Sequence, residues 1–139
     1  MNKTRILIAD RRPSIRFALC TLLKQQAGLE PVGEAADTKD LERQIELTRP
    51  DVILLDWRLD GLATADWLVD LRKASPGLYV IVLSGRPEVQ RAVLAAGADA
   101  FVSKIDPPDK LLAAVGSVQR VRFAWPSLEQ SLQGPDGSR

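Results

Sequence analysis

The 139-residue sequence contains no histidine. Histidine is the side chain whose charge changes near neutral pH, so its absence excludes histidine-based general acid or base catalysis. It also excludes a phosphohistidine carrier. Any phosphoryl group on this chain must therefore come from a partner.

Cysteine and long apolar segments are also scarce. The one cysteine, Cys20, cannot form a disulfide within the chain. No apolar run is long enough to span a bilayer, and Lys3 and Arg5 lead directly into a strand-like run without the pattern of a signal peptide. We therefore expect a cytoplasmic protein with no membrane partner.

The chain carries almost no net charge. Its 19 basic and 18 acidic residues give a formal charge of +1, which predicts no nucleic-acid partner through this chain. A length of 139 residues with 45% hydrophobic residues suits one domain. We assign residues 1–124 to that domain and residues 125–139, with their glycines, serines and prolines, to a flexible C-terminal tail.

The most informative stretch is an apolar run that ends in a carboxylate. Four consecutive apolar residues, 52–55, precede Asp56, as in a strand that is buried on both faces. The carboxyl ends of strands in an open parallel sheet form the ligand crevice, so Asp56 is a candidate functional residue. The alternative is a structural turn residue, although a strand end gives no reason to bury an unpaired charge.

Short apolar runs alternate with helix-period patterns along the chain. The expected strands are 5–9, 29–36, 52–56, 78–83 and 100–103, each followed by a segment with the apolar spacing of a helix. Pro31 and Gly33 weaken the second run, which suits an edge strand. The pattern predicts an α/β fold: a flavodoxin-like (βα)5 doubly wound parallel sheet with strand order 2-1-3-4-5.

Polar residues stand at the ends of four of the five expected strands, the first, third, fourth and fifth: Asp10, Asp56, Ser84 and Lys104. In the predicted order these four strand ends are neighbours, so their side chains should converge on one crevice. A carboxylate nucleophile, a second acid, a hydroxyl and a lysine together suit the acceptance of a phosphoryl group. The lysine and a cation would neutralise the phosphoryl oxygens.

From Arg5 to about Val121 the sequence resembles the receiver domains of response regulators in two-component signalling. The resemblance is carried by four motifs: ILIAD ending at Asp10, DVILLD ending at Asp56, VLSG around Ser84 and AFVSK ending at Lys104. The first motif resembles the family's strand with the acidic pocket, and the second resembles the strand that carries the phosphoryl acceptor. The third resembles the strand with the switch hydroxyl. The fourth resembles the strand that carries the switch aromatic residue and the lysine.

The resemblance implies a role for each of these residues. Asp56 would accept the phosphoryl group, Lys104 would pair with the acceptor carboxylate, and Ser84 would bond the phosphoryl group. Ser84 and Phe101 would form the switch. Mg²⁺ would be held by Asp10, Asp56 and the backbone carbonyl of Arg58.

One departure from the family affects the metal. The family usually has two adjacent acids after the first strand, whereas Arg11 follows Asp10 here. A missing acidic ligand and an added cation predict weak Mg²⁺ binding. In one interpretation the Arg11 guanidinium extends into solvent and only weakens the pocket. In the other it pairs with Asp56 or Asp10 in place of the metal.

Two hypotheses about function follow. In the first, the chain is a phosphorelay receiver: a histidine kinase or phosphotransfer protein phosphorylates Asp56, and the chain signals by contact with a downstream target protein or as a homodimer. In the second, it is a degenerate receiver that binds a partner without phosphorylation. We do not expect an enzyme, because a phosphatase of the haloacid dehalogenase type needs a second acid where Arg58 stands.

Overall fold

A computed structural model describes residues 3–59 and 65–118 of the chain. The predicted tail, 125–139, and the last residues of the predicted domain lie outside these described residues. Within the described part, no helix is both long enough and apolar enough to cross a membrane.

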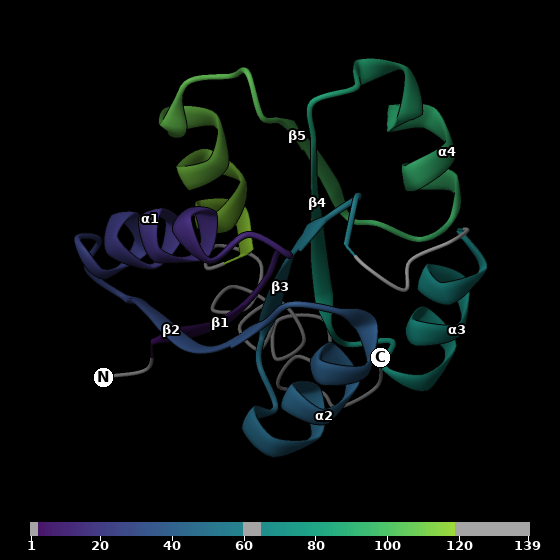
Figure 1. Cartoon of the computed structure of the whole chain (residues 1–139), viewed down its shortest axis with the longest axis horizontal. Helices are drawn as coiled ribbons and strands as arrows, with labels where there is room; N and C mark the ends of the chain where they lie inside the picture. The colour runs from purple at the N-terminus through teal and green to yellow at the C-terminus, as the bar shows by residue number, and fades with distance from the viewer. Residues whose placement is uncertain (1–2, 60–64, 119–139) are drawn as a thin grey trace, which may run out of the picture.

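Strands and helices alternate along the chain, as the sequence predicts. The strands are β1 (Thr4–Ala9), β2 (Leu29–Ala35), β3 (Val52–Asp56), β4 (Tyr79–Ser84) and β5 (Ala100–Ser103). The helices are α1 (Pro13–Lys24), α2 (Thr38–Thr48), α3 (Asp66–Ala74), the 3-10 helix η1 (Pro87–Val89) and α4 (Gln90–Ala95). Residues 108–118 form one more helix, drawn in yellow-green without a label in Figure 1.

Local sequence determines where helices begin and end. Pro13 is the first residue of α1, a position where its missing N–H costs nothing. Asp37 caps α2 by accepting the backbone N–H of Asp40 at 2.8 Å. The residue that follows this helix, Arg49, has a left-handed φ of 48° and stands just before Pro50.

The strands form one parallel sheet in the order β2-β1-β3-β4-β5, which confirms the predicted fold class. As Pro31 suggested, β2 lies at an edge. Its register with β1 is irregular: Ile6 pairs with Pro31 but Leu7 pairs with Gly33. Val32 is therefore an extra residue in the edge strand, next to a proline that has no N–H to donate to the ladder.

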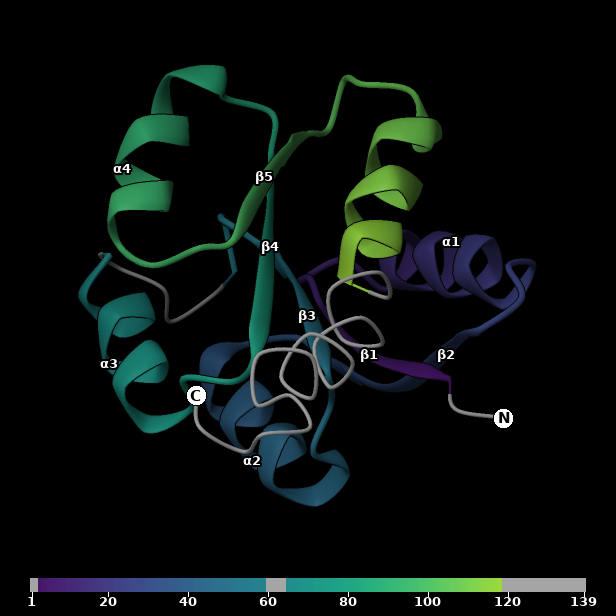
Figure 2. The same cartoon turned by 180° about the vertical axis from the view of Figure 1, so that it is seen from behind.

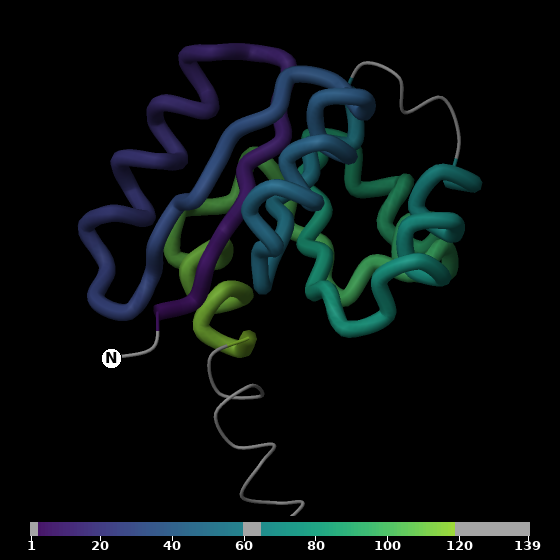
Figure 3. Tube along the Cα trace, turned by 90° about the horizontal axis from the view of Figure 1, so that it is seen from below, coloured from purple at the N-terminus to yellow at the C-terminus, as the bar shows by residue number. Residues whose placement is uncertain are grey.

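Helices cover both faces of the sheet, as Figures 1 and 2 show from opposite sides and Figure 3 from below. Successive strand residues point to opposite faces and so divide the core in two. One half, which includes Ile6, Ile8 and Leu54, packs against α1 and the 108–118 helix. The other, which includes Leu7, Ile53 and Leu55, packs against α2, α3 and α4. Burial on both faces explains the continuous apolar run before Asp56.

Arg72 connects α3 to the sheet beneath it. Its Nη1 donates to the carbonyl of Leu78, and its Nη2 donates to Asp99 Oδ1 at 3.1 Å. Asp99 Oδ2 in turn accepts the N–H of Val80 at 2.8 Å. Because the Arg72 guanidinium donates to two groups, and Asp99 is itself held by the N–H of Val80, the Arg72 side chain is not free to move aside.

Gly97 provides a test of this packing. Its φ of +120° is unfavourable for any residue with a side chain, and an added Cβ would lie 2.6 Å from Arg72 Cγ. We expect Gly97→Ala to lower the free energy of unfolding by about 2 kcal/mol. Gly77→Ala is the control, because nothing lies within 4 Å of its added Cβ. Urea unfolding of both variants measures the difference, and equal stability would contradict the proposed clash.

Candidate functional site

The polar residues predicted to converge lie at one edge of the sheet. Asp56 and Ser84 are the last residues of β3 and β4, while Asp10 and Lys104 directly follow β1 and β5. These four strands are neighbours in the sheet. Asp10, Asp56 and Ser84 are each at most 1% exposed. Two carboxylates buried this completely need cations or hydrogen-bond donors to offset their lost hydration.

Lys104 links the two carboxylates. Its Nζ lies 2.7 Å from Asp56 Oδ1 and 3.5 Å from Asp10 Oδ2. The backbone N–H of Arg58 donates to the same Asp56 oxygen at 3.3 Å. The other oxygen, Asp56 Oδ2, is buried and has no hydrogen-bond partner among the described residues. One oxygen of Asp56 is therefore held in place, and the other lacks a donor.

Arg12 provides the second cation of the pocket. Its backbone N–H donates to Asp10 Oδ1 at 2.8 Å, its Nε to the same oxygen at 3.3 Å and its Nη2 to Oδ2 at 3.4 Å. Burial alone would raise the pKa of Asp10. Hydrogen bonds from the Arg12 side chain and backbone, with the charges of Lys104 and Arg12, nevertheless hold that pKa below its usual value. Asp10 is therefore ionised at neutral pH.

Arg11, which the sequence suggested as the added cation, is exposed, and Arg12 lies on Asp10 instead. The reason is Pro13, because a residue before proline avoids the helical conformation. Arg12 is accordingly extended, with φ −99° and ψ 117°. This conformation turns the backbone N–H and the side chain of Arg12 back toward Asp10. The short Asp10 side chain can accept the N–H of Arg12 because that residue lies only two positions further along the chain.

A third arginine, missed by sequence reasoning, holds the backbone around the pocket. Arg16 Nη1 donates to the Asp10 carbonyl at 2.6 Å, and its Nε donates to Glu34 at 2.9 Å. It thereby ties α1 to the ends of β1 and β2. The signal for it was the spacing, since Arg16 follows Arg12 by four residues and so lies on the same side of the helix start.

Ser84 and Phe101, the predicted switch residues, lie on neighbouring strands. β4 and β5 pair in parallel, with Val82 opposite Phe101 and Ser84 opposite Ser103. The Ser84 hydroxyl oxygen accepts the N–H of Arg86 at 3.0 Å. The half-buried Phe101 packs against the core on the α2, α3 and α4 side and lines a surface cavity together with Pro87 of η1.

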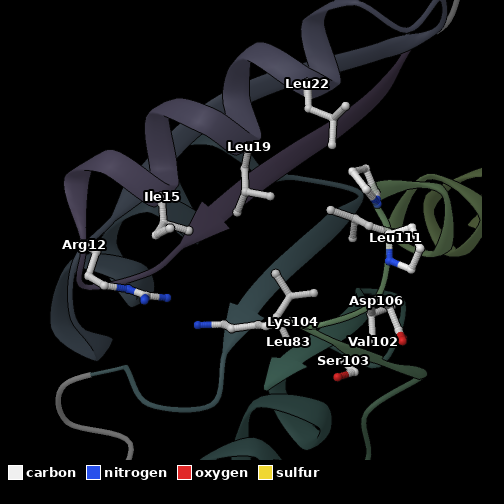
Figure 4. A pocket seen from close by; sticks show the side chains of 12 residues that line it. Arg12, Ile15, Leu19, Leu22, Leu83, Val102, Ser103, Lys104, Asp106 and Leu111 are labelled. Atoms are coloured by element: carbon white, nitrogen blue, oxygen red, sulfur yellow. The ribbon is translucent and has the colours of Figure 1, made fainter. Parts of the chain in front are cut away.

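A cavity of about 360 Å³ opens beside the two cations. Figure 4 shows the ends of the Arg12 and Lys104 side chains pointing toward each other at one end of it. The rest of the lining is mainly apolar and comes from α1, from the ends of β4 and β5, and from the start of the 108–118 helix, including Ile15, Leu83 and Leu111. The side chains of Arg12 and Lys104 are 43% and 24% exposed, so an anion that approaches from solvent would meet both.

The residues present fit Mg²⁺ poorly. This ion demands hard oxygen ligands in a nearly octahedral arrangement. Both oxygens of Asp10 already accept from Arg12, and Asp56 Oδ1 accepts from Lys104. Across the described ranges, no group of three histidine, cysteine, aspartate or glutamate side chains could hold a metal. Arg12 and a divalent cation would therefore compete for the same oxygens.

Several curated proteins with similar sequences are named as transcriptional regulators. The probable transcriptional regulatory protein SgaR of Hyphomicrobium methylovorum is 30% identical over 137 residues, which are 97% of this chain and 65% of SgaR. The phosphate regulon transcriptional regulatory protein PhoB of Escherichia coli is 34% identical over 120 residues, which are 84% of this chain and 52% of PhoB. The chain thus spans between half and two thirds of these relatives.

Solved structures of response regulators share the fold. A LuxR-family two-component response regulator from Aurantimonas superposes with a TM-score of 0.78 at 24% identity, covering 84% of this chain and 85% of that protein. RcsB of Salmonella enterica serovar Typhimurium, bound to promoter rprA in the presence of phosphomimetic BeF3⁻, gives a TM-score of 0.77 at 25% identity. That match covers 86% of this chain and 61% of RcsB.

These relatives show that the prediction of no nucleic-acid partner is wrong. SgaR and PhoB are named as transcriptional regulators, and RcsB is bound to promoter DNA. The net charge of this chain was a poor guide. The net charge of a receiver-length chain carries no information about the part of each relative that this chain does not match.

The model of the response regulator receiver domain family matches residues 6–116. The matched range runs from β1 into the 108–118 helix and contains Asp10, Asp56, Ser84 and Lys104. The family is one of signalling domains, which are in general not enzymes. The sequence match and the fold together place the chain in the family of response-regulator receiver domains of two-component signalling.

Proposed function

We propose that Asp56 accepts a phosphoryl group and that the chain thereby acts as the phosphorylated switch of a signalling pathway. The observation that carries this proposal is the geometry of Asp56, which is 1% exposed with one oxygen 2.7 Å from Lys104. Its other oxygen has no donor among the described residues. A carboxylate held by one oxygen and unpaired at the other is suited to act as a nucleophile.

The transfer itself needs little beyond position and charge. An oxygen of Asp56 attacks the phosphorus of the donor and forms a new O–P bond. The bond between phosphorus and the leaving group breaks, and the leaving group keeps the electron pair. The product is an aspartyl phosphate, whose added negative charge Lys104 would offset.

Ser84 and Phe101 would respond to the new group. The Ser84 oxygen accepts a hydrogen bond from Arg86, and its own hydroxyl hydrogen remains available to a phosphoryl oxygen. Movement of Ser84 would change the packing of Phe101 on the adjacent strand. Phe101 lines the surface cavity between η1 and the 108–118 helix, so the change would reach the surface. The two residues would then form a two-state element.

Mg²⁺ would bind weakly in this proposal. Its ligands would be Asp10, Asp56 and the backbone carbonyl of Arg58, and its contribution would be to neutralise phosphoryl oxygens. The hydrogen bonds from Arg12 to both oxygens of Asp10 support weak binding.

The output of the switch would be the control of transcription. The names of SgaR and PhoB support this, as does the promoter-bound state of RcsB. This chain matches only part of those proteins, so the DNA contact would come from a further domain or a bound partner. The alternative of a receiver that works without phosphorylation is not favoured by these relatives.

Acetyl phosphate provides a direct test of the acceptor. We expect intact-mass measurement to show addition of one phosphoryl group to the wild type and none to Asp56→Asn, because an amide is a poor nucleophile at phosphorus. Asp70→Asn, which removes an exposed carboxylate of α3, should label like the wild type. Labelling that persists in Asp56→Asn would contradict the proposal.

The ion pairs of the pocket also make stability depend on pH. A carboxyl whose pKa is lowered by folding stabilises the fold above its unfolded pKa, and that stabilisation is lost as the pH falls through the folded pKa. For Asp10 the loss begins below about pH 5. The charged groups that contact Asp10 are Arg12 and Lys104, and Lys104 also contacts Asp56.

Removing Arg12 should therefore move acid unfolding to higher pH. Arg12→Ala deletes the side-chain hydrogen bonds that lower the pKa of Asp10, while Arg11→Ala deletes an exposed side chain of the same charge. Circular dichroism during acid titration compares the two variants with the wild type. A shift of equal size in both variants would attribute the effect to net charge rather than to the pair with Asp10.

A further inference from the structure

The pocket is electrically balanced by its own side chains. Asp10 and Asp56 are its buried carboxylates, and Arg12 and Lys104 are the cations that contact them. Two negative and two positive groups sum to zero without a metal ion. A site built for a divalent cation has the opposite character, a surplus of negatively charged oxygens.

Arg12 occupies the oxygens that a metal would need. Its Nε and Nη2 lie 3.3 Å and 3.4 Å from the two oxygens of Asp10, as two prongs of one fork. Its backbone N–H adds a third donor at 2.8 Å. A divalent cation could bind Asp10 directly only after it displaced this fork.

Arg12 can also reach an incoming group. Its side chain is 43% exposed and points toward the end of the Lys104 side chain at one end of the cavity, as Figure 4 shows. The guanidinium has five N–H donors, of which two are used on Asp10. The remaining donors form a planar array that matches the oxygens of a phosphoryl group. Hydrogen bonding to Asp10 and the charges of Asp10 and Asp56 raise the pKa of Arg12, so it stays protonated.

We infer that Arg12 is the built-in counter-cation of this site, and that with Lys104 it binds the oxygens of a phosphoryl group on Asp56 without a divalent metal. The inference rests on the proposed role of Asp56 as acceptor. The O–P bond forms at Asp56 and the donor's bond to phosphorus breaks, as before. Arg12 and Lys104 offset charge and exchange no proton. Mg²⁺ competes with Arg12 for Asp10 rather than completing the site.

Beryllofluoride, a phosphoryl mimic, tests this without a transfer step. Trp57 directly follows Asp56 and is half-buried, so titration of the full chain can be followed by tryptophan fluorescence. We expect the wild type to bind beryllofluoride in chelator-treated, metal-free buffer, with a Kd within about threefold of that in Mg²⁺. This comparison uses the wild type alone and does not depend on the folding of any variant.

The neighbouring arginines offer a matched pair of variants. Arg12→Ala should weaken metal-free binding by about tenfold or more, and Mg²⁺ should restore it because the oxygens of Asp10 are then free. Arg11→Ala, which removes an exposed cation one residue away, should bind like the wild type in both buffers. Arg12→Lys should retain part of the metal-free affinity, because it keeps the charge and loses the fork. Thermal melts check that each variant is folded.

Wild-type binding that requires Mg²⁺ would overturn the role of Arg12, and so would metal-free binding that survives Arg12→Ala. Labelling with acetyl phosphate distinguishes an error in the role of Arg12 from an error in the proposed role of Asp56 as acceptor. If Asp56 is labelled only with Mg²⁺ present, the acceptor stands and the counter-cation is wrong. If neither buffer gives labelling or beryllofluoride binding, both are wrong.

Discussion

Two carboxylates lie buried side by side at the ends of adjacent central strands, and the rest of the site depends on how their charge is offset. Neither Asp10 nor Asp56 is more than 1% exposed. Lys104 reaches both from the end of β5, and Arg12 reaches Asp10 from the start of α1. Removing Lys104 would take away the cation that contacts Asp56, and removing the Arg12 side chain would leave Asp10 with Lys104 as its nearby cation, 3.5 Å away. Either loss is costly, because a buried charge with less compensation is unfavourable in a medium of low polarity.

The sheet makes this arrangement rigid. β1 and β3 are covered by helices on both faces, so the residues before Asp10 and Asp56 are held by dense apolar packing. The polar groups themselves stand at or just beyond the strand ends, where turns and helix starts bring side chains from distant parts of the chain together. Arg16 and Arg72 add to this rigidity, because each joins a helix to a backbone carbonyl next to the sheet.

Much of the fold could be predicted from the sequence, because the relevant signals are local. Residues 52–55 are apolar without interruption, as a strand covered on both faces requires. Pro31 marked the edge strand because a proline cannot donate to a central ladder. The partner prediction failed for the opposite reason. Net charge is a property of the whole chain and says nothing about domains that relatives carry beyond it.

The sequence by itself determined the strand order and the convergence of Asp10, Asp56, Ser84 and Lys104. Alternating apolar runs and right-handed crossovers indicate a parallel sheet with helices on both faces. The flavodoxin-like strand order expected of such a sheet then makes these four strand ends neighbours. Only the tertiary structure decided which arginine enters the pocket and which oxygen of Asp56 lacks a donor. Arg11 and Arg12 are chemically identical. The direction of each long side chain is set by backbone angles before Pro13 and by the position of Asp10, which exist only once the chain is folded.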